Sequence, residues 1–383
     1  MRADAIWPGG RGMQLHFTKM EGCGNDYIYV NGFAESVPQE EKSALVRRLS
    51  DRHFGIGGDG VIFINPSERA DFEMEMYNAD GSRAEMCGNG IRCVGKYVYD
   101  HGMTAGREVF TVESFGKVKT LELTCEGGRM RAARVDMGVP VLDPPQIPAI
   151  PSWEWGEEAG VSDIGATGSI AVSSWRTGEE AGGTAVRADA GAHGAAGDGR
   201  QQAAVPDITS GVAVSAHAGA FGEIESEDVA AWRSLNGNGA QRIMVADPIG
   251  VGGRAWAVTC VSMGNPHAVV FPQEQVEEMN LASVGPLFES HPRFPNRINT
   301  EFVRVEDRTH ITMRVWERGT GETLACGTGA CAAVVACVLN GLTERRAAVR
   351  LPGGTLTIEW DVRTNHVYLT GPAETVFEGE VEI

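Results

Sequence analysis

Two cysteines lie in nearly identical sequence contexts in widely separated parts of the chain. Cys87 begins a Cys-Gly-Asn-Gly sequence and Cys326 begins Cys-Gly-Thr-Gly, and an apolar run with helical spacing follows each. A glycine-rich turn lets the backbone approach a ligand closely, and a helix that follows directs its unpaired N–H groups and positive dipole end back toward the cysteine. Because a thiolate is favoured in that position, each cysteine could act as a base or nucleophile near neutral pH.

The two cysteine contexts belong to a longer internal repeat. Gly-Asn turns at Asn25 and Asn265 lie 240 residues apart, whereas Cys87 and Cys326 lie 239 residues apart. A nearly constant offset over both motifs predicts two related halves. Their equivalent cysteines would lie across a pseudo-two-fold axis and face one cleft. The alternative is that both are packing cysteines in glycine-rich turns.

Two thiols on opposite faces of one carbon suit a particular reaction. One thiolate removes a proton from a stereocentre, and the other thiol returns a proton to the opposite face; the reverse reaction exchanges these roles. Helix N-termini directed at an adjacent carboxylate would stabilise the carbanion-like transition state. A cysteine protease needs only one thiol with a histidine base, and a redox dithiol usually has a Cys-x-x-Cys motif, so neither explains the duplication.

The composition narrows the class of protein and its cofactors. The chain has 383 residues, enough for two domains, and its net charge of −18, half of it from residues 152–240, argues against nucleic-acid partners and acidic membrane surfaces. Neither a membrane span nor a signal peptide is apparent, and the eight scattered cysteines suit free thiols in a reducing cytosol. No cysteine–histidine pattern predicts a metal site. Pyridoxal phosphate needs a Schiff-base lysine and a phosphate site, whereas none of the five lysines lies in a phosphate-loop context, which favours a cofactor-free, two-base route.

Composition and turn signals divide the chain. Residues 1–12 are expected to be a disordered tail or a start-site extension before Met13. Residues 13–135, with 372–383, are assigned to an N-terminal half that contains Cys87, and residues 136–371 to a C-terminal half that contains Cys326. Within the latter, a low-complexity acidic Gly/Ala-rich insertion at about 155–240 cannot bury enough apolar surface to offset its ordering entropy. A separate module with a poor core is the alternative for this insertion.

Hydrophobic periodicity predicts an α+β protein with two pseudo-symmetric halves. Alternating apolar and polar residues indicate many short strands, as at 72–77 and 310–316, and most are expected to pair antiparallel. Each half should have a strand-rich, mostly antiparallel domain wrapped around one central helix, the helix that follows its cysteine.

The chain resembles a known family, the diaminopimelate epimerases. The resemblance rests on N-A-D-G-S-x-x-x-x-C-G-N-G, S-M-G-N-P-H, E-R-G-x-G-E-T-x-A-C-G-T-G-A-C-A-A and L-P-G-G, which occur in this order. It covers about 13–150 and 243–383 and implies the same two-half fold. It also implies cofactor-independent epimerisation of LL-2,6-diaminopimelate to the meso form, for lysine and peptidoglycan synthesis, by a cytoplasmic protein expected to be a homodimer.

The resemblance assigns roles to individual residues. It implies that Cys87 and Cys326 are the base and acid, and that His267 and Glu317 bias their pKa values. The reacting carboxylate would bind the N–H groups of two turns, Gly88-Asn89 and Gly327-Thr328. The residues expected to hold the rest of the substrate are Asn25, Asn78, Asn265, Asn299, Glu317 and Arg318.

One departure and two alternatives remain open. The family often has a glutamine where Gly60 stands, so Gly60 is only a weak candidate for a substrate contact. Proline racemases and hydroxyproline epimerases also use two cysteines, but tend to have a histidine at the position of Asn89 and need no clamp for a distant carboxylate. A non-catalytic binding protein on the same fold would be expected to have lost one cysteine, and both are present.

Overall fold

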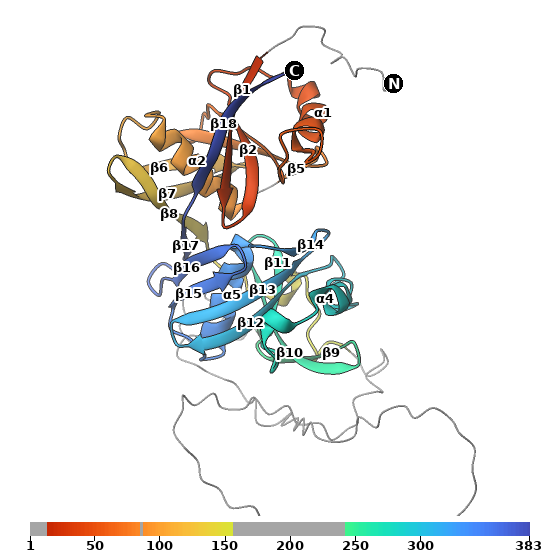
Figure 1. The fold of residues 1–383 in the computed structure, drawn as a ribbon. Coiled ribbons are helices and arrows are strands. Elements are labelled where there is room, and N and C mark those ends of the chain that lie inside the picture. The colour runs from red at the N-terminus through yellow and green to blue at the C-terminus, as the bar shows by residue number, and fades with distance from the viewer. Residues whose placement is uncertain (1–13, 85–86, 156–241) are drawn as a thin grey trace, which may run out of the picture. The chain divides into compact units, whose positions relative to one another are not determined.

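The computed structural model describes residues 14–84, 87–155 and 242–383, which all fall within one compact unit (Figure 1). The tail expected at 1–12 lies outside the described residues, as does almost all of the insertion expected at about 155–240. None of the helices within the described ranges is both long enough and apolar enough to cross a membrane.

The first part of the chain contains a series of strands interrupted by two helices. These elements are β1 (Gln14–Gly22), β2 (Asn25–Asn31), α1 (Gln39–Ser50), β3 (Gly60–Asn65), β4 (Phe72–Asn78), β5 (Arg83–Ala84), α2 (Gly88–Asp100), β6 (Val109–Ser114), β7 (Lys117–Glu126) and β8 (Arg129–Gly138).

The rest of the described chain repeats this series with short additions. Its elements are η1 (Pro144–Gln146), β9 (Asp247–Val251), β10 (Arg254–Ser262), β11 (Pro266–Val270), η3 (Val276–Glu278), α4 (Leu281–Glu289), β12 (Asn299–Asp307), β13 (His310–Glu317), β14 (Gly321–Thr323), α5 (Gly327–Leu339), β15 (Arg346–Leu351), β16 (Gly354–Trp360), β17 (Val367–Gly371) and β18 (Glu374–Glu382).

The strand pairing has the same pattern in both parts. From β1 to β8 the successive pairs are β1–β2 antiparallel, β2–β3 parallel, β3–β4 antiparallel, β4–β6 parallel, and β6–β7 and β7–β8 antiparallel. From β10 to β17 the orientations recur in the same order. The equivalent strands β8 and β17 also pair with each other, antiparallel, with Val135 opposite Leu369. This pairing is what a pseudo-two-fold relation between the parts requires.

The strands that follow β8 and β17 also occupy corresponding positions. After β8 the chain continues to β9, which pairs antiparallel with β10. After β17 it continues to β18, which returns to pair antiparallel with β1, from Gln14 opposite Glu382 to Glu21 opposite Glu374. The strands β1, β2 and β18 accordingly lie side by side although β18 is the last strand of the chain (Figure 1).

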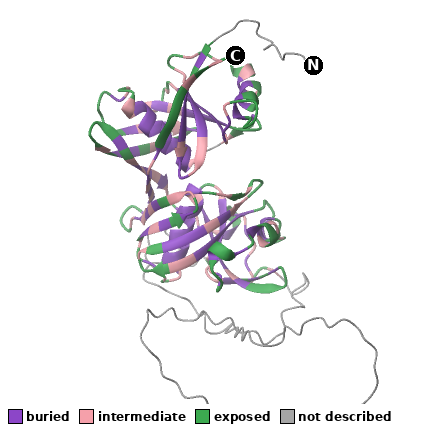
Figure 2. Ribbon diagram, in the orientation of Figure 1, coloured by how far each residue is buried: buried purple, intermediate pink, exposed green. Residues whose placement is uncertain are grey.

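A helix lies at the centre of each set of strands. Residues Gly329–Leu339 of α5 are all buried, and their small alanine, valine and cysteine side chains let strands pack closely around the helix (Figure 2). The helix α2 is also buried over most of its length, and its Lys96 is neutralised by Asp100 at 3.1 Å. The α+β fold with two related strand-rich halves, each around a central helix, is therefore confirmed.

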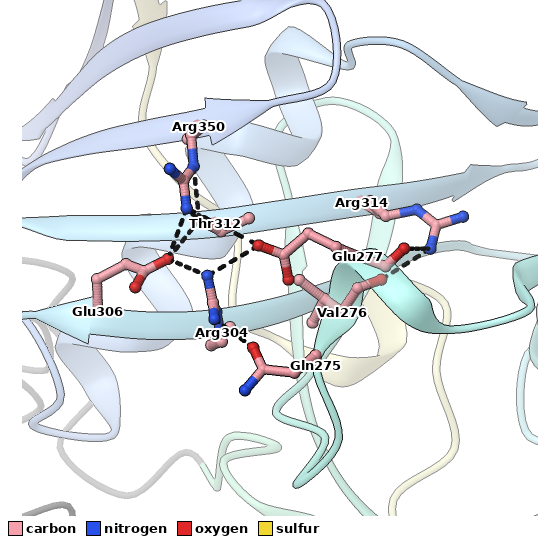
Figure 3. A network of polar contacts seen from close by, with 8 residues as sticks. All are labelled: Gln275, Val276, Glu277, Arg304, Glu306, Thr312, Arg314 and Arg350. Carbon is pink, nitrogen blue, oxygen red and sulfur yellow. Dashed lines mark hydrogen bonds and ion pairs between the residues drawn. The ribbon is translucent and has the colours of Figure 1, made fainter.

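A polar network covers one face of the second set of strands (Figure 3). Arg304 on β12 contacts Glu306 at 2.5 Å and Glu277 in η3 at 2.8 Å, and Arg350 on β15 reaches Glu306 at 3.0 Å. Arg314 on β13 donates to the carbonyl oxygen of Val276 at 2.7 Å. Exposed ion pairs contribute little stability one by one, so the main consequence is that η3 is held against β12 and β13.

Candidate active site

A cavity of about 1180 Å³ brings most of the predicted site residues together. Those that line it are Asn25, Asn78, Cys87, Gly88, Asn89, Asn265, Asn299, Glu317, Arg318, Cys326, Gly327 and Thr328. His267 and Gly60 are not among the lining residues. The cavity therefore lies where the two repeats meet, with one cysteine from each.

Each cysteine is the N-cap of its central helix. The Sγ atom of Cys87 accepts a hydrogen bond from the Gly90 N–H at 3.3 Å, and Cys326 Sγ accepts one from the Gly329 N–H at 3.4 Å. The two helices begin close to each other, because a Cβ added to Gly327 would lie only 3.4 Å from the Cα of Gly88. A glycine at both positions allows this approach and leaves the first N–H groups of both helices near one ligand.

The expectation that the helix N-termini would favour thiolates near neutral pH is not met. Burial raises the pKa of the Cys87 thiol, and the N–H groups of Gly90 and Asn89 oppose this increase only in part. Burial also raises the pKa of Cys326 well above its usual value, and the carboxylates of Glu317 and Glu301 raise it further. Desolvation therefore outweighs the helix terminus at both thiols in the ligand-free protein.

On the Cys87 side, Asn25 links the thiol to an aspartate. Cys87 Sγ donates to Asn25 Oδ1 at 3.1 Å, and Asn25 Nδ2 donates to Asp59 Oδ2 at 2.6 Å. Asp59 also lines the cavity and pairs with Arg52 at 2.8 Å. Sequence reasoning missed Asp59, although the Gly-Gly-Asp-Gly turn that carries it was an available signal.

On the Cys326 side, a buried histidine lies between two acceptors. His267 Nδ1 is 2.7 Å from Glu301 Oε1, and its Nε2 is 3.0 Å from Asn265 Oδ1. His267 and Glu301 are both fully buried, and Glu301 Oε2 has no hydrogen-bond partner among the described residues. His267 therefore acts on the cavity through Asn265 and does not line it. Nothing in the sequence distinguished Glu301 from the other strand residues.

Glu317 approaches the second thiol directly. Its carboxylate accepts a hydrogen bond from the Thr323 hydroxyl, and it lies near enough to the Cys326 thiol for its charge to raise the pKa of that thiol. Burial raises the pKa of Glu317, and the hydrogen bond from Thr323 opposes the change. A carboxylate in this position favours the protonated form of Cys326.

The side chains of Arg318 and Asn299 differ in their exposure and in how fully their hydrogen-bonding groups are paired. The Arg318 side chain is exposed, and its Nη1 donates to the carbonyl oxygen of Asn296 at 3.2 Å. Asn299 is almost fully buried, donates to the Pro266 oxygen and accepts from the Arg318 N–H at 2.9 Å. Asn299 thus fixes the backbone that presents Arg318, while the guanidinium retains donors for a ligand.

Gly60 is a structural glycine. It pairs with Asn78 across β3 and β4, and a Cβ at this position would lie 1.9 Å from the carbonyl oxygen of Tyr77. No side chain fits here without movement of the backbone. The weak expectation that Gly60 contacts substrate is not supported, because the neighbouring Asp59 lines the cavity instead.

Comparison with known proteins agrees with this geometry. The sequence model of diaminopimelate epimerase matches residues 17–142 and 259–376. The diaminopimelate epimerase of Acetivibrio thermocellus is 44% identical over 369 residues, which is 96% of this chain and 99% of the relative. That of Desulfovibrio desulfuricans is 42% identical over 96% of this chain and 99% of its own length.

The chain belongs to the diaminopimelate epimerase family. The recognition made from the four sequence motifs is therefore confirmed. Each of the two segments that match the family model contains one of the two cysteines. Together the segments include every residue that was expected in the site.

Solved structures of lower sequence similarity share the fold of this family member. A phenazine biosynthesis protein of the PhzF family from Bacillus anthracis has a TM-score of 0.54 and 13% identity, covering 97% of this chain and 100% of its own. A hydroxyproline epimerase from Agrobacterium vitis has a TM-score of 0.52 and 11% identity, covering 96% and 91%. At such identities these likenesses show the fold alone.

Proposed function

We propose that this protein converts LL-2,6-diaminopimelate to meso-diaminopimelate by a cofactor-independent, two-base reaction. The observation that carries the proposal is the pair of N-cap cysteines, Cys87 and Cys326, that line one cavity at the start of two adjacent helices. Membership of the diaminopimelate epimerase family supports this substrate. The product serves lysine and peptidoglycan synthesis.

Proton transfer then needs one ionised and one protonated cysteine. The thiolate takes the proton from the α-carbon, and the electron pair of the broken C–H bond delocalises into the adjacent carboxylate. The opposite thiol gives its proton to the other face of the carbon, so the two sulfurs exchange protonation states in each turnover. The N–H groups at Gly88-Asn89 and Gly327-Thr328 stabilise the developing charge on that carboxylate.

Asn89 takes part in this carboxylate site through its backbone. Its side-chain amide is already engaged, because Nδ2 donates to the Ala325 oxygen and Oδ1 accepts from Arg92. Thr328 has its hydroxyl 3.5 Å from Cys326 Sγ. The backbone N–H groups of the two turns are therefore the donors assigned to the carboxylate.

The distal end of the substrate carries a second ammonium and a second carboxylate. Arg318 is placed to bind that carboxylate with a bidentate guanidinium fork, since its side chain is exposed at the cavity. The remaining contacts are assigned to the cavity residues Asn25, Asn78, Asn265, Asn299 and Glu317. Asparagine amides satisfy both zwitterionic groups without adding net charge.

A proline racemase or hydroxyproline epimerase activity is the second candidate. The fold is shared with a hydroxyproline epimerase. Asn89 argues against this activity, because those enzymes tend to have a histidine at this position. Here the Asn89 amide is instead bonded to Ala325 and Arg92. Arg318 also favours a substrate with a distal carboxylate.

We also propose the extent of the two halves, the location of the protein and its oligomeric state. The N-terminal half consists of 13–135 with 372–383, the C-terminal half is 136–371, and the protein acts in the cytoplasm as a homodimer.

Site-directed variants test the proposed activity. Cys87→Ala and Cys326→Ala should each abolish formation of meso-diaminopimelate from the LL isomer, measured by chiral chromatography without added cofactor. Cys125→Ala is the matched control, because that cysteine does not line the cavity and should be dispensable. Full turnover by either active-site variant, with the fold verified by circular dichroism, would contradict the two-base reaction.

A further inference from the structure

Tyr27 occupies the position in the first repeat that His267 occupies in the second. The two residues are 240 residues apart, the same offset as that of the two Gly-Asn turns. Tyr27 is opposite Gly60 in the β2–β3 register, and His267 is opposite Asn299 in the β11–β12 register. The repeat therefore places a tyrosine where the second half has a histidine that is bonded to Asn265.

The correspondence extends over three strands in each half. Gly60 is opposite Asn78 in the β3–β4 register. In the second half, Asn299 begins β12 and Glu317 ends β13, next to the pair of Thr300 and Trp316. Each half thus has a row of three residues, which are Tyr27, Gly60 and Asn78 in the first and His267, Asn299 and Glu317 in the second. Every residue of the second row has a polar side chain, whereas the middle residue of the first row has no side chain.

The Tyr27 ring lies beside this glycine. A Cβ on Gly60 would lie 2.8 Å from Cε1 of Tyr27. Tyr27 lines the cavity although the residue is only 5% exposed. Burial raises the pKa of its hydroxyl, and the charges of Cys87 and Asp59 raise it further. The hydroxyl therefore stays protonated well above neutral pH, and it lies close to the groups that surround the Cys87 thiol.

The acceptors in this part of the cavity suit an ammonium group. Asn25 Nδ2 donates to Asp59 at 2.6 Å, which directs Asn25 Oδ1 toward Cys87 Sγ at 3.1 Å. Glu317 adds a carboxylate that also lines the cavity and whose charge raises the pKa of Tyr27. An ammonium group has three N–H donors, and a phenol oxygen can accept a hydrogen bond while it donates its own. Tyr27 can therefore be the third acceptor beside Asn25 and Glu317.

We propose that Tyr27 is a substrate-binding residue whose hydroxyl oxygen accepts a hydrogen bond from the ammonium group on the reacting carbon. This inference rests on the proposed function, which supplies the ammonium group. The reacting carbon lies between the two thiols, so its ammonium group is close to Cys87 and to the row that contains Tyr27. The phenol on β2 thus provides a polar contact that Gly60 on β3 cannot provide.

The test compares the wild-type protein with Tyr27→Phe, which keeps the ring beside Gly60 and removes only the hydroxyl. We expect kcat/KM for LL-diaminopimelate to fall at least about tenfold, because a hydrogen bond to a charged group is lost. The loss should appear mainly as a higher KM, since the ammonium is bound in the ground state as well as in the transition state. The inhibition constant of pimelate, the same dicarboxylate without amino groups, should not change.

Tyr77→Phe is the matched control, because it removes a phenol hydroxyl from the same half. That hydroxyl bonds to Glu75 at 2.8 Å and to Gln39 at 2.8 Å, and Tyr77 does not line the cavity. This variant should have a lower melting temperature and an unchanged kcat/KM. If pimelate does not inhibit the wild-type protein, the comparison of kcat/KM between the two variants decides.

Several results would overturn the proposal. One is an unchanged kcat/KM in Tyr27→Phe, and another is an equal loss of kcat/KM in Tyr77→Phe. An inhibition constant of pimelate that rises as much as KM would also overturn it, because the hydroxyl would then serve a carboxylate or the fold. Absence of turnover by the wild-type protein would instead refute the proposed function, and the ammonium contact with it.

Discussion

The side-chain amide of Asn89 donates a hydrogen bond to the carbonyl oxygen of Ala325 at 3.3 Å, and so joins the first turn of the helix after Cys87 to the residue before Cys326. Its Oδ1 atom accepts a bond from Arg92 at 3.0 Å, and the residue is only 2% exposed. One buried amide therefore holds the two proton-transfer groups relative to each other.

Removal of this amide should reduce catalysis more than its stability cost suggests. Asn89→Ala leaves the Ala325 oxygen and an Arg92 N–H unpaired, which costs about 1–3 kcal/mol for each buried group. We expect kcat/KM for LL-diaminopimelate to fall at least about tenfold, because a small displacement of a proton-transfer group is costly. Asn340→Ala is the control: it removes bonds to Thr259 and Ala336 at the far end of α5 and should lower the melting temperature alone. Unchanged kcat/KM in Asn89→Ala would refute this role.

The distal clamp predicts a dependence on substrate length. Arg318→Ala should lower kcat/KM by at least about thirtyfold, since the loss of a charge-assisted pair costs on the order of 2–5 kcal/mol. Arg318→Lys should rescue only part of this loss, because a point charge cannot reproduce the fork. The measurement compares LL-diaminopimelate with L-lysine, which lacks the distal carboxylate. Equal use of both substrates by the wild-type protein would favour the proline racemase alternative.

The sequence predicted those features that depend on local spacing. A cysteine before a glycine-rich helix start is a local pattern, and its recurrence after 239 residues predicted the two related halves and the cavity-lining positions of Cys87 and Cys326. Arg92 and Glu301 could not be assigned in the same way. The burial of both side chains depends on which strands pack against which helix, and a buried charge has no local signature.

The protonation state of the thiols could not be predicted from the sequence either. A helix N-terminus is predictable from sequence, but the degree of burial that opposes it is a tertiary property. The glycine at position 60 is another case, since only the packed carbonyl oxygen of Tyr77 explains why no side chain fits there. A sequence difference from the family therefore gave no reliable indication of a missing contact.

The raised thiol pKa values predict how activity varies with pH. Burial raises the pKa of Cys87 above the usual range of a thiol, so the free enzyme has little thiolate at pH 7. The base must lose a proton, and the competent fraction therefore increases as pH rises toward that pKa. We expect kcat/KM to rise from pH 7 to 8.5, by up to roughly tenfold per unit. Arg318→Ala should show the same slope at a lower level, and a flat or falling wild-type profile would contradict the assignment.

Residues 156–238, which correspond to the predicted insertion, should be dispensable for catalysis. The residues on either side of this segment are already close, because the Arg242 guanidinium lies 4.8 Å from the centre of the Trp153 ring. Replacement of residues 156–238 by a short Gly/Ser linker should leave kcat/KM within roughly tenfold, since the entropy of closing a chain segment depends weakly on its length. Loss of activity in a variant that remains folded would instead assign this segment a part in substrate access or partner binding.

Solvent isotope incorporation reports whether two opposed cysteines epimerise diaminopimelate. The purified protein, without added cofactor, is incubated in D₂O with LL-diaminopimelate, and substrate and product are separated at low conversion for mass spectrometry. We predict one deuterium at the α-carbon of each meso product molecule and almost none in the recovered LL substrate, because one thiol removes hydrogen and the other delivers deuterium. L-Proline should show no exchange. Product that retains its hydrogen, or exchange of L-proline without exchange of diaminopimelate, would contradict two-base epimerisation of diaminopimelate.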